Sequence, residues 1–175
     1  MKGSLSAALA QLARQSFAGG NYWHGPLTTM VESLTAEQAL WRPAPERKCI
    51  WEIVRHITFW REYLLAHVQG KPTPDPEANN WSLPEPADDE AWRADLQRLR
   101  AVQEELVRWF EQRDDEALLR QDEESGYEQF LMEAGVLLHD SYHMGQIATL
   151  RALMGLPPVD PEGESEGENA PEEQE

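Results

Sequence analysis

The chain reads LHDSYHMGQI from Leu138 to Ile147, and this stretch indicates a helix that presents two histidines on one face. His139 and His143 are four residues apart, so on a helix their side chains lie one turn from each other. Two ring nitrogens can then reach the same metal ion. Gln146 returns to that face, and we expect its amide close to whatever the histidines bind. Such a pair without the glutamate of the zinc-protease motif is a modest signal, so a third ligand is needed.

A third candidate ligand, His56, lies in the stretch CIWEIVRHITFW from Cys49 to Trp60. Apolar residues recur here at helical spacing, and His56 is beside the centre of their stripe, which predicts that it points inward. Three imidazoles with a fourth position left for water is the arrangement of catalytic zinc sites. The alternative is that His56, His139 and His143 are three separate core histidines, each hydrogen-bonded to a neighbouring group.

Taken together, the two stretches resemble the DinB-like family, the damage-inducible, YfiT-like family of metal-binding helical proteins. Shorter similarities extend the match over about residues 17–155: WHGP at 23–26, LTAEQA at 34–39 and LRALMG at 150–155. The resemblance implies an all-α four-helix bundle, often a homodimer. It also implies a divalent ion held by three histidines, which in this sequence correspond to His56, His139 and His143.

Helical periodicity and capping patterns predict the elements. We expect a helix over Ser4–Phe17, a continuation over 26–34, a short helix capped by Thr35, and long helices over about 49–69, 88–110 and 127–154, with Asp88 as the cap of the helix over 88–110. The last of these is apolar almost all round, which predicts the most buried helix, and Ser125 with Glu128 predicts a capping box before it. Five prolines between residues 72 and 86 predict a long proline-rich crossover loop between the second and third helices of the bundle, docked by Trp81.

The composition predicts one soluble domain, because 175 residues with 41% hydrophobic content can form a single core. We place this domain at residues 1–158 and expect the acidic stretch 159–175 to be a disordered tail. A formal net charge of −17 argues against nucleic acid or an anionic membrane as the main partner. The sequence has neither a signal-peptide pattern nor an apolar run of about 20 residues, so we expect a cytoplasmic protein.

An ion on three neutral imidazoles keeps its double charge and lowers the pKa of a bound water or thiol. The resemblance implies an S-transferase that uses a low-molecular-weight thiol, such as bacillithiol or mycothiol, as nucleophile toward a small-molecule substrate. Two alternatives stay open: a hydrolase with a metal-bound water, and a stress protein that binds a metal or ligand without turnover. Zinc or nickel suits three imidazoles best, while iron, cobalt and manganese stay open.

Of three further polar residues, Glu52, His67 and His24, only Glu52 is a candidate for a place near the ion. Glu52, one turn before His56, could orient an imidazole or act as a base, although a first-turn glutamate is more commonly a solvated residue favoured by the helix dipole. His67 lies eleven residues after His56, about 16 Å along a helix, which is too far to share an ion. We expect His67 to be partly exposed and His24 to lie in a turn, and we place neither in the site.

Overall fold

The computed structural model describes residues 4–19 and 23–160, and within these residues every named element is a helix. The all-α prediction is therefore confirmed for the described part of the chain. Of the predicted acidic tail, only Val159 and Asp160 lie inside the described residues. No helix among the described residues is both long and apolar enough to cross a bilayer.

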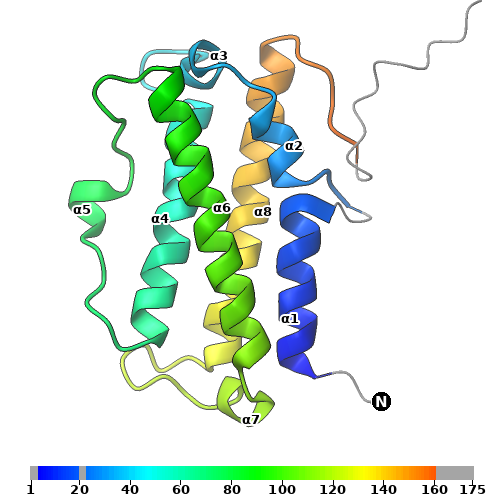
Figure 1. Ribbon diagram of the computed structural model, residues 1–175, viewed down its shortest axis with the longest axis vertical. Coiled ribbons are helices and arrows are strands. Elements are labelled where there is room, and N and C mark those ends of the chain that lie inside the picture. The colour runs from blue at the N-terminus through cyan, green and yellow to red at the C-terminus, as the bar shows by residue number, and fades with distance from the viewer. Residues whose placement is uncertain (1–3, 20–22, 161–175) are drawn as a thin grey trace, which may run out of the picture.

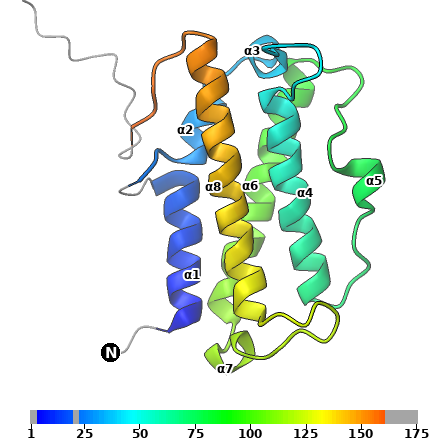
Figure 2. The ribbon, with the colours of Figure 1, turned by 180° about the vertical axis from the view of Figure 1, so that it is seen from behind.

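Four longer helices lie side by side in Figures 1 and 2: α1 (Leu5–Arg14), α4 (Ile50–Val68), α6 (Asp89–Gln112) and α8 (Gln129–Leu153). Helix α4 packs against both α6 and α8, and α1 packs mainly against α6. A π-helical turn, η1 (Gln15–Gly19), extends α1, so the predicted helix over 4–17 changes its winding after Arg14. The shorter helices are α2 (Leu27–Glu32), α3 (Ala36–Leu40), α5 (Pro76–Asn79) and α7 (Asp115–Leu118).

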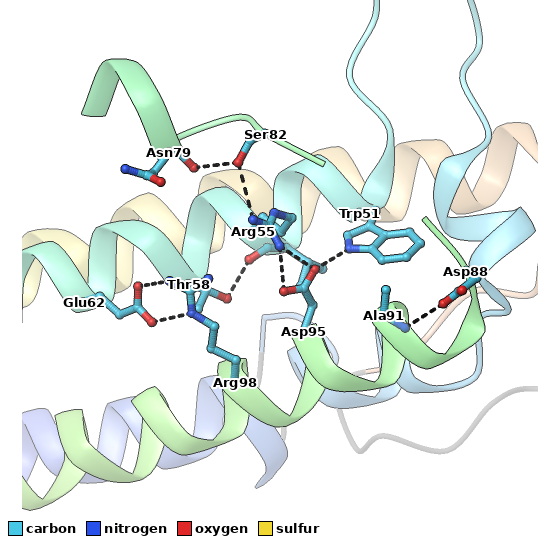
Figure 3. Close-up of polar contacts among 11 residues, drawn as sticks. Trp51, Arg55, Thr58, Glu62, Asn79, Ser82, Asp88, Ala91, Asp95 and Arg98 are labelled. Atoms are coloured by element: carbon cyan, nitrogen blue, oxygen red, sulfur yellow. Dashed lines mark hydrogen bonds and ion pairs between the residues drawn. The ribbon is translucent and has the colours of Figure 1, made fainter. Parts of the chain in front are cut away.

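Helices α4 and α6 run in the same direction. Arg55 pairs with Asp95, Glu62 with Arg98 and Gln69 with Glu105, so the partners advance together along both helices. Figure 3 shows the first two of these pairs, with the Trp51 indole nitrogen donating to the same Asp95 carboxylate at 2.7 Å. Residues 69–88 connect the end of α4 to the start of α6, and they contain the short helix α5.

Two of the predicted helix caps form and one does not. The Asp88 carboxylate accepts the backbone N–H of Ala91 at 2.9 Å, and Thr35 forms a capping box with Gln38. The capping box predicted at Ser125 is wrong. The Ser125 N–H donates to the Asp122 carboxylate at 2.7 Å within a turn that Gly126 completes at φ 72°, and α8 begins only at Gln129.

The prediction that the last helix is the most buried is also wrong. Twelve of the nineteen residues of α4 are buried, against nine of the twenty-five residues of α8. Apolar side chains of α8 are instead strongly exposed, namely Leu131, Leu138, Tyr142 and Leu153. Helix α4 is the most enclosed because α6 and α8 cover it from two sides and the segment 69–88 adds Trp81.

Candidate metal centre

The three predicted histidines converge between α4 and α8. His56 comes from α4, and His139 and His143 come from α8. The Nε2 atom of His139 lies 3.0 Å from Nε2 of His56 and 3.1 Å from Nε2 of His143. Nitrogens bound to one tetrahedral zinc ion at about 2.0–2.1 Å are separated by roughly 3.3 Å. The spacing is thus close to that of a ligand set, and these three residues could hold a metal ion.

Two of the histidines are held by side-chain amides on the far side of their rings. His56 Nδ1 donates to the Asn80 side-chain oxygen, and His143 Nδ1 donates to the Gln146 side-chain oxygen at 2.7 Å. An amide oxygen only accepts, so the ring proton is on Nδ1 and a lone pair is on Nε2. Gln146 therefore lies where the sequence placed it, beside the histidines.

This arrangement fits a cation better than it fits three core histidines. The lone pairs of His56 and His143 both face Nε2 of His139, which has at most one hydrogen to donate. One of the two contacts would then join two lone pairs. A divalent ion among the three nitrogens accepts all the lone pairs at once, which is how neutral imidazoles bind metals.

Burial keeps His56 and His143 in the neutral form that a ligand requires. Burial lowers the pKa of His56 to about 4, with smaller contributions from His143 and His139, while the hydrogen bond to Asn80 opposes the shift. Burial likewise lowers the pKa of His143. Neither ring carries a proton on Nε2 at neutral pH, so no proton has to be displaced from these two rings before an ion binds.

His139 is the least constrained of the three rings. Its Nδ1 lies 3.6 Å from Oδ1 of Asp140, and within the described residues neither atom has a hydrogen-bond partner. The other carboxylate oxygen of Asp140 accepts from Nε of Arg61 at 2.9 Å, and both residues are fully buried. A carboxylate beside the distal nitrogen of a histidine ligand orients the ring and raises its basicity. Asp140 had no sequence signal, because a residue adjacent to His139 points to a different side of the helix.

The segment 69–88 contributes two contacts to His56. The Trp81 ring stacks on the His56 ring, with centroids 3.7 Å apart and planes inclined by 14°, which confirms that Trp81 docks this segment. Asn80 supplies the acceptor for Nδ1 of the same ring. The role of Asn80 was not predicted, because the path of a proline-rich segment over the bundle cannot be read from its periodicity.

Glu52 is not brought to the histidines. Its carboxylate accepts the backbone N–H of Cys49 at 3.0 Å and binds the side chains of Arg42 and Lys48. Burial by itself would raise the pKa of Glu52, but the three donors together outweigh it and lower the pKa. Glu52 is 6% exposed, so it is a buried cap of α4 and not the solvated residue that its position suggested.

The two histidines left out of the predicted site lie outside the cluster. His67 Nε2 is 3.1 Å from the Asp122 carboxylate, and its Nδ1 is 3.5 Å from Glu124. The His67 side chain is partly buried, as expected for a residue at the mouth of a pocket. His24 Nδ1 donates to the backbone carbonyl of Gly25 at 2.9 Å.

Two pockets adjoin the three histidines. The first, of about 560 Å³, borders His56 and His139 between α4 and α8, and we call it the apolar pocket. Its other lining residues are Trp60, Tyr63, Leu64, His67, Met132, Gly135 and Val136. The second, of about 800 Å³, borders His143 and includes Lys48, Trp81, Tyr142 and Gln146. Both volumes lie in the range of small-molecule sites.

Comparison with known proteins agrees with this geometry. The model of the DinB superfamily matches residues 26–147, a stretch that contains all three histidines and the segment that carries Asn80 and Trp81. No curated protein sequence matches the chain. Because the family match covers more than half of the chain and includes both histidine-bearing helices, the chain belongs to the DinB superfamily.

Proposed function

We propose that the protein binds one divalent metal ion through His56, His139 and His143 and uses it to activate a low-molecular-weight thiol for transfer to an electrophile. The observation that carries this proposal is the convergence of three Nε2 atoms, two of them with their ring protons fixed on the opposite nitrogen. When bound, such an ion lowers the pKa of a coordinated thiol and makes the thiolate available at neutral pH.

The nucleophile has to come from outside the chain. Cys49 is the single cysteine of the sequence, and it is fully buried at the start of α4. Burial raises the pKa of the Cys49 thiol, so this residue is a poor nucleophile. A free thiol that reaches the histidines through one of the two pockets is not enclosed by the core, and its pKa is not raised by burial at the start of α4.

The two pockets support a reaction with two organic substrates. One pocket borders His56 and His139, and the other borders His143, so two molecules can approach the same three nitrogens from different sides. A hydrolase needs only one organic substrate and water. Hydrolysis by a metal-bound water nevertheless uses the same ligand set, and it is the second candidate.

The test is the absorption spectrum and activity of the cobalt-loaded protein. We expect bacillithiol or mycothiol to add a sulfur-to-cobalt band. The same thiols should consume 1-chloro-2,4-dinitrobenzene, because the thiolate forms a C–S bond to the ring as the C–Cl bond breaks and chloride leaves. His143→Ala should abolish both effects, and His67→Ala, which leaves the three histidines of the cluster intact, should keep the sulfur-to-cobalt band. Metal-dependent turnover of esters without thiol would establish the hydrolase instead. A spectrum unaffected by thiol, with no turnover, would leave a protein that binds metal only.

We also propose that a second copy of the chain packs on the exposed face of α8. The charged residues of this helix, Glu133, Asp140 and Arg151, are all buried, while Leu138 is 74% and Tyr142 65% exposed. Two chains of net charge −17 repel each other least where the contact face carries no charge. Light scattering should show that Leu138→Lys converts a dimer into a monomer, and circular dichroism should show that its helicity is unchanged. An unchanged mass would contradict the proposal.

A further inference from the structure

We infer that the apolar pocket binds an uncharged substrate with an aromatic or similarly apolar body, held with its reacting atom beside His56 and His139. This inference rests on the proposed function, since it names the class of the electrophile. It is carried by the lining of the pocket, by what lies at each of its ends, and by the open space above Gly135.

The walls of the apolar pocket exclude charge. Among its nine lining residues there is no lysine, arginine, aspartate or glutamate. Moving a charged group from water into such a lining costs free energy that no partner returns. Trp60 and Tyr63 line one wall, and their ring centroids are 5.2 Å apart. The centroid of the Trp60 ring lies 6.2 Å from that of the His56 ring. A series of rings in contact favours a flat apolar ligand.

The two ends of the apolar pocket differ in chemistry. One end holds His56 and His139, the ligands of the proposed ion. The other end holds His67, about 16 Å away along α4. Asp122 and Glu124 both lie against the His67 ring, so an anionic group at this end would be repelled by two carboxylates just behind the lining. The pocket therefore suits an elongated molecule whose electrophilic atom faces the histidines and whose far end carries no negative charge.

Gly135 provides a way to fill this pocket without changing the three ligands. Apart from the two neighbouring residues and the backbone of its own helix, a Cβ atom added at Gly135 meets no atom within 4 Å, although the residue lines the apolar pocket. A leucine at this position enters the open volume and does not press on the core. Gly145 lies on the same helix and is equally unobstructed, but it does not line this pocket. Both substitutions replace a helical glycine, so their effects on the helix itself are matched.

The experiment is equilibrium dialysis of two probes, 2-naphthol and naphthalene-2-sulfonate, against the zinc-loaded full-length protein in the absence of thiol. We expect wild-type protein to bind 2-naphthol at least tenfold more tightly than the sulfonate. Gly135→Leu should weaken naphthol binding at least tenfold, and Gly145→Leu should change it less than twofold. Circular dichroism and elemental analysis should show the same helicity and zinc content in all three proteins.

Three results would overturn the inference: no binding of 2-naphthol to the wild-type protein, equal binding of the sulfonate, or unchanged binding by Gly135→Leu. These results are separate from the test of the proposed function, because dialysis contains no thiol and requires no turnover. Naphthol binding that depends on Gly135, together with a cobalt spectrum unaffected by thiol, would support the pocket and refute the S-transferase. A thiol-dependent reaction with unchanged naphthol binding in Gly135→Leu would support the S-transferase and refute the assignment of the apolar pocket.

Discussion

The two longest helices of the protein, α6 and α8, distribute their charges in opposite ways. Helix α6 follows the usual amphipathic pattern, with a buried face that contains Trp92, Leu99, Leu106 and Phe110 and an exposed face rich in arginine and glutamate. Helix α8 buries its charged side chains, Glu133, Asp140 and Arg151, and exposes Leu131, Leu138, Tyr142 and Leu153.

The difference separates a helix that supports the fold from one that carries the site. A buried charge is costly unless it is paired, so a protein that retains three of them on one helix has given each a partner. Asp140 binds Arg61 and faces His139, Arg151 donates to the carbonyl of Met30 at 2.8 Å, and Glu133 lies 3.2 Å from Arg113. In α8 the buried face holds the charged side chains and His143, with His139 beside them.

The largest expected effect is the loss of the ion when one of its ligands is removed. We expect tag-free wild-type protein to contain about one divalent ion per chain, and His56→Ala and His143→Ala to contain less than a tenth of that amount. Elemental analysis gives the metal content, and circular dichroism checks that the helices are retained.

His67→Ala is the matched control, because His67 lies on α4 like His56 but outside the cluster. It should keep a full complement of metal. Equal loss of metal in His67→Ala, or a full complement in His143→Ala, would remove the basis for calling α8 the site-bearing helix.

The next effect concerns leucines on the two helices. Leu106 on α6 is completely buried and Leu138 on α8 is 74% exposed. Leu106→Ala should lower the free energy of unfolding by about 2–5 kcal/mol because it leaves a cavity. Leu138→Ala should change it by less than about 0.5 kcal/mol. Urea unfolding of dilute, metal-free protein measures both values, and similar losses in the two variants would erase the contrast between the helices.

A smaller effect tests whether the site extends beyond the helices. Asn80→Leu keeps the approximate size of the side chain but removes the acceptor for Nδ1 of His56. Loss of such a partner typically weakens metal affinity by about 10–100-fold. Competition with a chromogenic chelator gives the zinc affinity. Asn79→Leu is the control, because the Asn79 amide donates to the backbone of Asp75 and not to a histidine. The zinc affinity of this variant should equal that of the wild type.

The smallest effect is an opposite pH dependence of two buried glutamates. Burial raises the pKa of Glu133 above its ordinary value of 4.5, and the charge of Arg113 only partly opposes this. The folded state therefore holds the Glu133 proton more tightly than the unfolded state, and wild-type stability falls as the pH rises through the folded pKa. Glu133→Gln should be more stable than wild type at pH 8, and the difference should disappear below pH 4.5.

Glu52 has the reverse sign, because its three hydrogen-bond donors lower its pKa. Its contribution to stability is complete above its ordinary pKa of 4.5 and is lost as the pH falls through the folded value. Glu52→Gln should be less stable than wild type at pH 8, and the deficit should shrink toward pH 3.5. Urea unfolding of metal-free protein across this range measures both trends, and parallel profiles for the two variants would contradict the assignment.

The sequence was informative wherever a local rule governs the structure. The spacing of His139 and His143, the position of His56 within an apolar stripe and the cap at Asp88 all depend on helical geometry alone, and the structure bears out their placement. The failures at Glu52 and Asn80 involve contacts between a helix and the segment that precedes or follows it. Glu52 seemed solvated because Arg42 and Lys48, which enclose it, belong to a preceding loop. Asn80 escaped notice because its partner is twenty-four residues earlier in the chain.

The placement of Asn80 and Trp81 on one segment also has a consequence for the rates at which an ion would bind and dissociate. Both residues contact His56, one at the edge of the ring and the other on its face, so the ring is clamped from outside the helices. An ion bound to three histidines would dissociate from them one at a time. Release from His56 would require its ring to rotate, and Asn80 and Trp81 hold the ring in place while the segment 69–88 covers it. We therefore expect the residence time of a bound ion to depend on the opening of this segment, so that exchange is slow even when the equilibrium affinity is modest.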